Sequence, residues 1–295
     1  IDTLIHLLKY DSVHRNSEVI KASDDKIHIG KQKNIQIISS RDIKALNFGN
    51  YGAKLVIECT GAFNEFHKAN AHLYGGIQRV IISAPATDTP TFVYGVNHTT
   101  YQQESIISNA SCTTNALAPI AKVLHENFTI TSGLMTTIHS YTNDQNLLDS
   151  KHKDLRRARA AGLNMIPTST GAAKAIGLVM PELQGKLNGF AIRVPTPDVS
   201  IVDLTCIVEK EVTKELINET FLKASKTTMQ NLILVDEDKR VSSDFIGSPY
   251  SAILIPDCTA VVNKNQLKVV AWYDNEWGYS MRLVDIASFV AKSIP

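Results

Sequence analysis

A cysteine flanked by hydroxyl residues, Cys112 in the run Ser-Cys-Thr-Thr, stands where an apolar strand gives way to a helix. Residues 105–107 are typical of the end of a buried strand. The apolar residues after the cysteine recur with the spacing of one helical face: Leu117, Ile120, Ala121 and Leu124. A thiol at a helix N-terminus lies at the positive end of the macrodipole, which favours thiolate and can lower the pKa from ~8.5 towards ~7 or below. The alternative is a buried structural cysteine.

One histidine, His139, follows in a β-branched run over 135–142 that is typical of a strand. Neutral imidazole can take the proton of a neighbouring thiol, and imidazolium then stabilises the thiolate. These two residue types could therefore act as a nucleophile and its base. A single histidine on a strand is more often structural, so the spacing alone leaves this pairing open.

An arginine inside an apolar run is an unusual feature that suggests a functional role. Arg193 stands between two β-branched residues, and an arginine without a partner is costly to bury in a strand. The run Thr-Ser-Thr-Gly at 168–171 reads by itself as a turn, and the basic residues in 151–159 as a solvated face. Asn275 offers a side-chain amide after a strand, where a polar turn is the alternative interpretation.

The elements expected to position these groups begin with two apolar runs, 55–60 and 79–83, which read as buried parallel strands. Each run ends in small or turn residues. Ligands of open α/β sheets gather at the carboxyl ends of such strands. Thr60, Gly61 and Ser83 would therefore face a bound cofactor, unless they are ordinary turn residues.

After Cys112 the strands become longer, as is expected of a mostly antiparallel sheet with one covered face. They are predicted at 133–142, 189–194, 199–210, 231–235, 251–255 and 267–273. A helix is predicted over 214–225 with Thr213 as its N-cap, and another over 281–292.

The composition narrows the class of protein. The 295 residues are 44% hydrophobic, enough to bury a sizeable core, and their number suggests two domains. A net charge of +1 gives no reason to expect a nucleic-acid or membrane partner, and no apolar stretch approaches the ~18 residues that cross a bilayer. The four cysteines are scattered without a C-x-x-C pair, which argues against a metal site and fits a reducing cytoplasm.

Six motifs in a fixed order resemble the phosphorylating glyceraldehyde-3-phosphate dehydrogenases. They are Ser-Asn-Ala-Ser-Cys-Thr-Thr-Asn (108–115), Thr-Ile-His-Ser-Tyr-Thr (137–142), Arg-Arg-Ala-Arg-Ala-Ala (156–161), Pro-Thr-Ser-Thr-Gly (167–171), Arg-Val-Pro-Thr-Pro (193–197) and Trp-Tyr-Asp-Asn-Glu-Trp-Gly-Tyr (272–279). The similarity runs from about Leu4 to Ile294. It implies an α/β plus α+β fold, with a Rossmann-type parallel-sheet domain formed by 1–111 and 275–295 and a mostly antiparallel catalytic domain formed by 112–274.

The resemblance also implies an oxidoreductase that converts glyceraldehyde 3-phosphate and inorganic phosphate into 1,3-bisphosphoglycerate. Cys112 would form a thiohemiacetal and then a thioester, and His139 would act as its base. The phosphate-binding residues that it implies are Thr142, Arg193 and nearby Arg157 for the substrate, and Ser111, Thr113, Thr170 and Gly171 for inorganic phosphate. The cofactor contacts that it implies are Arg41, Thr60, Gly61, Ser83, Asn275 and Tyr279.

The cofactor implied is NAD or NADP, and the preference stays open. Ser150-Lys151 replaces a Leu-Pro pair typical of strictly NAD-dependent members and could accept the 2′-phosphate of NADP. In the family a strand, a G-x-G-x-x-G turn and a helix precede the segment that matches 7–14, and no such turn occurs in these residues. We therefore expect this βαβ opening to be missing from the chain. A cytoplasmic homotetramer is implied, with the basic residues of 151–159 at a subunit interface.

Three other interpretations stay open. Erythrose-4-phosphate dehydrogenase shares the class and mechanism, although Thr142 and the run 168–171 favour the triose enzyme. A cysteine hydrolase would use the same Cys112 and His139 but would leave the phosphate sites and Asn275 unexplained. A catalytically inactive interaction protein would keep a reactive thiol without cofactor-dependent turnover.

Overall fold

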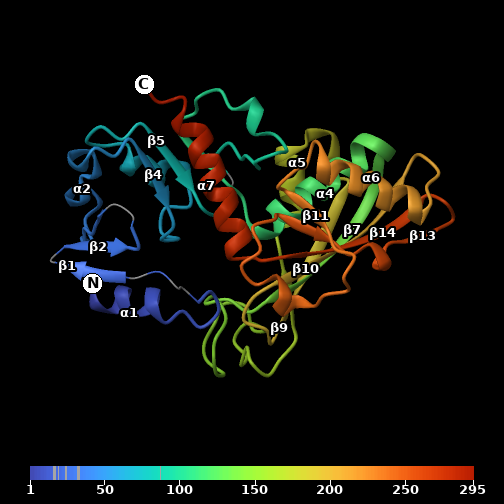
Figure 1. Ribbon diagram of the computed structural model, residues 1–295, viewed down its shortest axis with the longest axis horizontal. Helices are drawn as coiled ribbons and strands as arrows, with labels where there is room; N and C mark the ends of the chain where they lie inside the picture. Colours follow the sequence, from blue (N-terminus) through green and yellow to red (C-terminus); the bar gives the residue numbers. More distant parts are fainter. Residues whose placement is uncertain (16–17, 19, 24, 32–33, 87) are drawn as a thin grey trace.

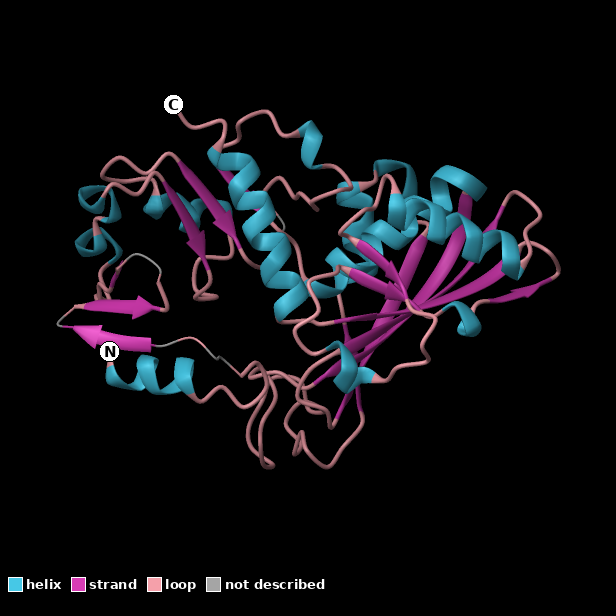
Figure 2. Cartoon of the chain, viewed as in Figure 1, coloured by secondary structure: helices cyan, strands magenta, loops and turns pink. Residues whose placement is uncertain are grey.

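The computed structural model describes residues 1–295 except 16–17, 19, 24, 32–33 and 87. Among the described residues the strands form three sheets, and the last helix lies between two of them (Figure 1 and Figure 2). The helices are α1 (Asp2–Lys9), α2 (Ile43–Leu46), α3 (Phe66–Ala69), α4 (Cys112–Phe128), α5 (Ala172–Val179), α6 (Lys214–Lys226) and α7 (Trp277–Ala291). The strands are β1 (Ile20–Ser23), β2 (Lys26–Ile29), β3 (Ile35–Gln36), β4 (Leu55–Glu58), β5 (Arg79–Ile82), β6 (Ile106–Ser108), β7 (Ile130–Ser140), β8 (Ile166–Ser169), β9 (Leu187–Val194), β10 (Ser200–Val208), β11 (Ile233–Val235), β12 (Ala252–Leu254), β13 (Ala260–Val262) and β14 (Gln266–Tyr273).

The strands β4, β5 and β6 form the predicted parallel sheet, in that order. Ile81 and Ile107 on one face pack against Ile286 and Val290 of α7. The other face forms a separate core around Val80 with residues of α3. Both faces of β5 and β6 are covered, so these strands read in the sequence as continuous apolar runs rather than as alternating ones, whereas Ile57 of β4 is exposed.

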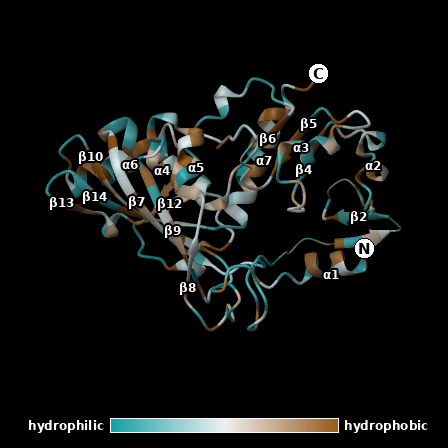
Figure 3. Ribbon diagram, turned by 180° about the vertical axis from the view of Figure 1, so that it is seen from behind, coloured by the Kyte–Doolittle hydropathy of each residue, from teal (hydrophilic) through white to brown (hydrophobic). Residues whose placement is uncertain are grey.

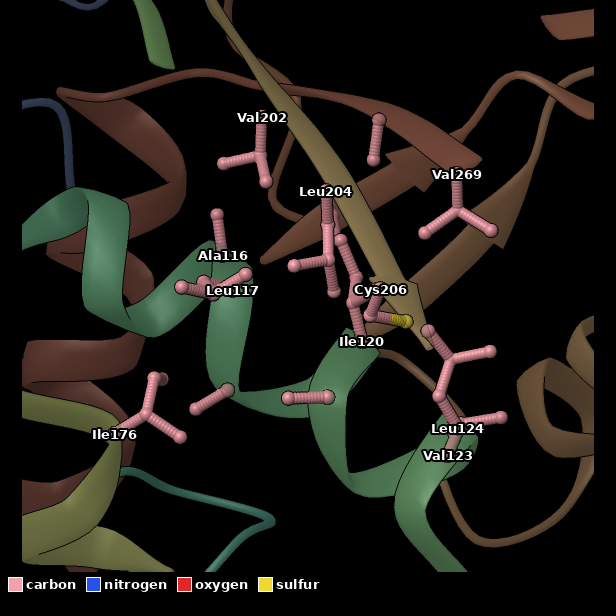
Figure 4. Packing of buried hydrophobic residues seen from close by; sticks show 14 of the residues in the cluster. Ala116, Leu117, Ile120, Val123, Leu124, Ile176, Val202, Leu204, Cys206 and Val269 are labelled. Carbon is pink, nitrogen blue, oxygen red and sulfur yellow. The ribbon is translucent and has the colours of Figure 1, made fainter. Parts of the chain in front are cut away.

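The large sheet has the order β11-β12-β14-β10-β7-β9-β8, with β13 paired to β14. The pairs β7–β9 and β11–β12 are parallel and the others antiparallel, so the expectation of a mostly antiparallel sheet is confirmed. Buried residues alternate with less buried ones along β10, and its buried Val202, Leu204 and Cys206 pack against α4 (Figure 4). The predicted apolar face of α4 is buried there, including Leu117 and Leu124. Seen from behind, hydrophobic residues recur along the strands of the large sheet and along the helices that cover it (Figure 3).

Several elements differ from expectation. The strand β8 covers part of the run 168–171 that by itself reads as a turn, and the helices α2, α3 and α5 and the strand β13 were not predicted. The helix α7 begins at Trp277, earlier than the predicted residue 281, because a carboxylate oxygen of Asp274 accepts the N–H groups of Glu276 (2.9 Å) and Trp277 (2.7 Å) and so starts the helix. The antiparallel strands β1, β2 and β3 and helix α1 were not predicted, and α1 packs on the strands through Ile5. Within the described part of the chain, none of the helices is sufficiently long and apolar to cross a membrane.

Candidate active site

The thiol of Cys112 and the imidazole of His139 are in contact. Cys112 is the first residue of α4, which is capped by Ser111, whose hydroxyl accepts the N–H of Thr114 (3.1 Å). His139 is the penultimate residue of β7, and its Nε2 lies 3.4 Å from Sγ of Cys112. The fold therefore brings together the two residues that the sequence suggested as nucleophile and base.

A backbone carbonyl fixes the tautomer of His139. Its Nδ1 lies 2.7 Å from the carbonyl oxygen of Ser140. Because a carbonyl can only accept, Nδ1 carries the proton and donates it to this bond. The neutral ring then presents the lone pair of Nε2 to the thiol of Cys112, as a general base requires.

Burial disfavours the charged form of both groups, and it therefore opposes the thiolate predicted from the helix N-terminus. Burial raises the pKa of the Cys112 thiol, and it outweighs the hydrogen bond with Thr113 and the charge of Arg193, which both lower that pKa. Burial and the charge of Arg193 lower the pKa of His139 to about 4. Desolvation disfavours each charged form more strongly than the helix N-terminus favours thiolate.

A buried tyrosine that the sequence did not single out links the elements that carry this pair. The hydroxyl of Tyr273, at the end of β14, lies 2.9 Å from the hydroxyls of both Thr113 and Thr137. Thr113 follows Cys112 in α4, and Thr137 precedes His139 by two residues in β7. The ring of Tyr273 also meets that of His139 edge-on, with centroids 6.0 Å apart. Tyr273 lies within one of the quoted motifs, but no local signal shows which hydroxyls it contacts.

Arg193 lies beside the pair and carries hydrogen-bond donors. The parallel register of β7 and β9 pairs it with His139. Its Nη1 donates to the hydroxyl of Thr142 (3.0 Å) and to the carbonyl of Ser140 (3.1 Å). Its Nε is buried and has no hydrogen-bond partner within the described residues. This guanidinium is available to an anion.

Arg157 is held by groups that the sequence did not identify. It forms an ion pair with Asp144, and its Nε donates to the hydroxyl of Thr168 (3.0 Å). Burial raises the pKa of Asp144, but the hydrogen bond and the charge of Arg157 outweigh this effect and lower that pKa below its ordinary value.

The residues expected to hold inorganic phosphate lie at two helix starts. Ser111 caps α4, and the hydroxyl of its neighbour Thr113 is buried against Tyr273, so Thr113 can offer only its backbone N–H. Thr170 and Gly171 precede α5, and the hydroxyl of Thr170 accepts the N–H of Ala172 (3.2 Å). Of these four residues only Ser111 is among the described residues that line the large cavity beside Cys112.

A cavity of about 1260 Å³ gathers seven of the predicted residues. They are Ser83, Ser111, Cys112, Thr142, Arg157, Asn275 and Tyr279. Residues at the carboxyl ends of β4 and β5 form part of its wall, including Cys59. The wall formed by residues 83–85 agrees with the expectation that ligands gather at the carboxyl ends of parallel strands.

The amide of Asn275 is oriented by two hydroxyls. Its Oδ1 accepts from Ser140 (2.9 Å) and from Ser200 (2.7 Å), so its Nδ2 is the donor end of the amide. Tyr279 also lines the cavity, and its hydroxyl donates to the carbonyl of Ala110 (3.2 Å). Neither serine was identified from the sequence, because their spacing from Asn275 carries no local pattern.

The other three predicted cofactor residues do not line this cavity. The hydroxyl of Thr60 donates to Glu58 and accepts the N–H of Ala62 (3.1 Å), so it serves the turn after β4. Gly61 occupies this turn with φ +77°, a conformation that glycine adopts without strain. Arg41 is exposed in a bend before α2.

The cavity fits a dinucleotide in size and chemistry. Its volume is above the ~300–1,000 Å³ of most small-ligand sites. It joins the edge of a parallel sheet to the Cys112 thiol, and the amide of Asn275, whose Oδ1 is taken by Ser140 and Ser200, offers Nδ2 as a donor to a carboxamide oxygen.

Comparisons with known proteins agree with this geometry. Residues 1–66 match the family model described as glyceraldehyde 3-phosphate dehydrogenase, NAD binding domain, and residues 111–275 match its C-terminal domain. The chain is 50% identical over 293 residues to glyceraldehyde-3-phosphate dehydrogenase 1 of Bacillus cereus (98% of this chain, 88% of the relative). It is 50% identical over 294 residues to the enzyme of Geobacillus stearothermophilus (99% and 88%). It is 51% identical over 296 residues to that of Mycobacterium tuberculosis (99% and 87%).

Proposed function

The chain belongs to the glyceraldehyde-3-phosphate dehydrogenase family, and on this premise we propose that it oxidises and phosphorylates glyceraldehyde 3-phosphate to 1,3-bisphosphoglycerate with NAD or NADP. The observation that carries the proposal is the 3.4 Å contact between Sγ of Cys112 and Nε2 of His139 beside a cavity with Thr142 and Asn275.

Cys112 acts as the nucleophile. Its sulfur attacks the aldehyde carbon while its proton passes to Nε2 of His139, and the product is a thiohemiacetal. The Ser140 carbonyl stabilises the imidazolium through Nδ1 (2.7 Å). The backbone N–H of Cys112, at the start of α4, is the donor for the developing oxyanion.

His139 then acts as the base for oxidation. The imidazolium first gives its proton to the oxyanion, which becomes the hemiacetal hydroxyl, and the neutral ring then takes this proton back as the carbon is oxidised to a thioester. A nicotinamide cofactor, when bound, supplies the hydride acceptor for this oxidation. Inorganic phosphate attacks the thioester, the C–S bond breaks, and Cys112 leaves as a thiolate that regains its proton.

Two sets of donors serve the phosphates. Arg193 and Thr142, joined at 3.0 Å, are proposed to bind the substrate phosphate, with Arg157 beside them. Inorganic phosphate is assigned to Ser111, Thr113, Thr170 and Gly171. Asn275 would hold the carboxamide of the cofactor, and Ser83 and Tyr279 would contact it; Arg41, Thr60 and Gly61 support this assignment less, because they do not line the cavity.

A homotetramer accounts for apolar side chains that one chain leaves in contact with water. Leu147, Leu148, Leu155, Leu163 and Met165 are all exposed in the segment 141–165. The uncovered face of the large sheet adds Leu134 and Phe190. Exposed apolar patches of this kind mark protein interfaces. Sedimentation at several concentrations tests the assembly, and a monomer at micromolar concentration would contradict it.

The test of function is reduction of NAD and of NADP, followed by the absorbance of the reduced cofactor, with glyceraldehyde 3-phosphate and phosphate. Turnover that requires phosphate and disappears in Cys112→Ser supports the proposal. Erythrose 4-phosphate as the better substrate would favour the related dehydrogenase. Peptide hydrolysis abolished by Cys112→Ser, without cofactor reduction, would favour a cysteine hydrolase.

A further inference from the structure

His14, in the loop after α1, lies among three carboxylates. Its Nε2 is 3.0 Å from Oδ2 of Asp274 and 3.1 Å from Oδ2 of Asp198, and its Nδ1 is 3.7 Å from Glu276. The side chains of both aspartates are fully inaccessible to solvent. The imidazole also stacks on the ring of Trp277, with centroids 5.5 Å apart. The Nε2 contact with Asp274 is a hydrogen bond, whereas the Asp198 carboxylate has no hydrogen-bond partner within the described residues and faces the ring as a charged group.

These contacts connect two parts of the lining of the cavity, here called its two walls, that come from segments far apart in the sequence. Ser12 and Val13, which immediately precede His14, line one wall. Pro197, Asn275 and Glu276 line the other, and each is a sequence neighbour of Asp198 or Asp274. The contacts of His14 therefore fix the distance between the two walls.

We propose that protonated His14 is a positioning residue that joins the two walls of the cavity, so that cofactor affinity falls when the proton is lost above neutral pH. The effect on cofactor affinity rests on the proposed function. The connection of the two walls through His14 and the aspartates, called the joint below, does not. His14 does not contact the reacting atoms and acts through the loop at 12–13 and through Asn275.

The charges around His14 explain why the joint needs the proton. Asp198, Asp274 and Glu276 face the ring from the other segments, and Asp11 on its own loop accepts the N–H groups of Val13 (2.8 Å) and His14 (2.6 Å). Neutral imidazole has one N–H and can donate from Nε2 only if Nδ1 gives up its proton. Its loss of charge would leave Asp198 and Asp274 buried side by side without a cation.

The direction of the pH dependence follows from the pKa shifts of His14 and Asp198. Burial lowers the pKa of His14, but the hydrogen bond and charge of Asp274, with the charges of Asp198 and Glu276, outweigh it and raise the pKa above its ordinary value. Burial and the nearby carboxylates raise the pKa of Asp198 to about 7. Because the pKa of His14 is raised, its contacts stabilise the folded chain at acid pH, and this stabilisation is lost as the pH rises through that pKa. Ionisation of Asp198 above about pH 7 adds repulsion between carboxylates and so also lowers the stability as the pH rises.

The joint can be titrated without any ligand, because His14 stacks on Trp277. Removal of the other tryptophan by Trp272→Phe leaves Trp277 as the fluorescent reporter. We expect its emission to titrate with a midpoint above the ordinary histidine pKa of ~6.5, and this transition to be absent in His14→Gln. The matched control is His28→Gln, which removes a histidine bound to Ser23 at 2.8 Å on the exposed hairpin.

Calorimetric titration of NAD and NADP then measures the effect on affinity. For the unmodified chain we expect binding to weaken on the order of tenfold from about pH 6 to 9, the change that one unit of pKa coupling allows. His14→Gln is expected to bind weakly at both pH values. Asp198→Asn removes the repulsion but keeps an oxygen acceptor, so it is expected to retain affinity at the higher pH.

The outcomes separate the joint from the proposed function. A Trp277 titration that is unchanged in His14→Gln, or cofactor affinity independent of pH in both chains, would overturn the joint. Absence of NAD and NADP binding at every pH, with the fluorescence transition intact, would overturn the proposed function and leave the joint standing. Circular dichroism of each variant confirms that a loss of binding is not a loss of folding.

Discussion

The imidazole of His139 and the carbonyl of Ser140 are joined by a 2.7 Å hydrogen bond, so the backbone of β7 itself selects the tautomer that faces Cys112. The strand that carries the base thus also orients it. This differs from sites in which a carboxylate side chain orients the histidine, because a carbonyl stabilises imidazolium without adding a negative charge.

Replacing His139 by asparagine should slow catalysis by about 10²- to 10⁴-fold, because the general base is lost while the side chain keeps a similar length. Steady-state kinetics with saturating cofactor measures this change in kcat. His28→Asn, which alters a histidine on the remote hairpin, should leave kcat unchanged. A His139→Asn chain that retains full kcat would remove His139 from the mechanism.

Alkylation of Cys112 in the unliganded chain should rise with pH through neutrality without a plateau, because burial raises the pKa of its thiol. The thiol form is favoured below this pKa, and the reactive thiolate appears only as the pH approaches it. Iodoacetamide labelling followed by peptide mass spectrometry separates Cys112 from the exposed Cys59 and Cys258. A labelling midpoint below about pH 7 would show that the helix N-terminus prevails over burial.

Tyr273→Phe should lower the free energy of unfolding by about 1–3 kcal/mol, because the hydroxyls of Thr113 and Thr137 lose their shared buried partner. Urea unfolding measures this difference. Tyr51→Phe is the matched control, since Tyr51 is exposed. Equal stability of the two variants would mean that the threonine hydroxyls find other partners.

Arg193→Lys should reduce kcat/KM for glyceraldehyde 3-phosphate by about 10- to 100-fold, mainly through KM. Lysine keeps the charge but cannot donate from a planar guanidinium to Thr142, to the Ser140 carbonyl and to a phosphate at once. Arg159→Lys provides the comparison, because Arg159 is an exposed arginine paired with Asp149. An unchanged KM in Arg193→Lys would assign the substrate phosphate to other residues.

Most of the large elements could be predicted from the sequence, because the spacing of apolar residues along each element depends directly on which of its faces is buried. The apolar run of β5 indicates a strand covered on both faces, and the stripe with Leu117 and Leu124 shows the buried face of α4. The start of α7 was placed too late because its cap is the Asp274 carboxylate, which a search for an apolar stripe does not detect.

The site was predictable in its residue types but not in its electrostatics. Burial of Cys112 depends on the whole fold, so a rule about helix N-termini alone gave the wrong direction for its pKa. The hydroxyl of Thr60 donates to Glu58, two residues away, a contact that its place after an apolar run does not indicate. Tyr273 and Asp144 had no detectable signal, since their partners lie far along the chain or within a loop.

The packing of α7 against β5 and β6 has a consequence for how the chain folds during synthesis. Ile286 and Val290 complete the core around Ile81 and Ile107, about two hundred residues earlier in the chain. That face of the parallel sheet therefore stays uncovered until α7 has left the ribosome. The nascent chain thus exposes an apolar sheet face for most of its synthesis, and a chaperone that binds such surfaces has its longest opportunity there.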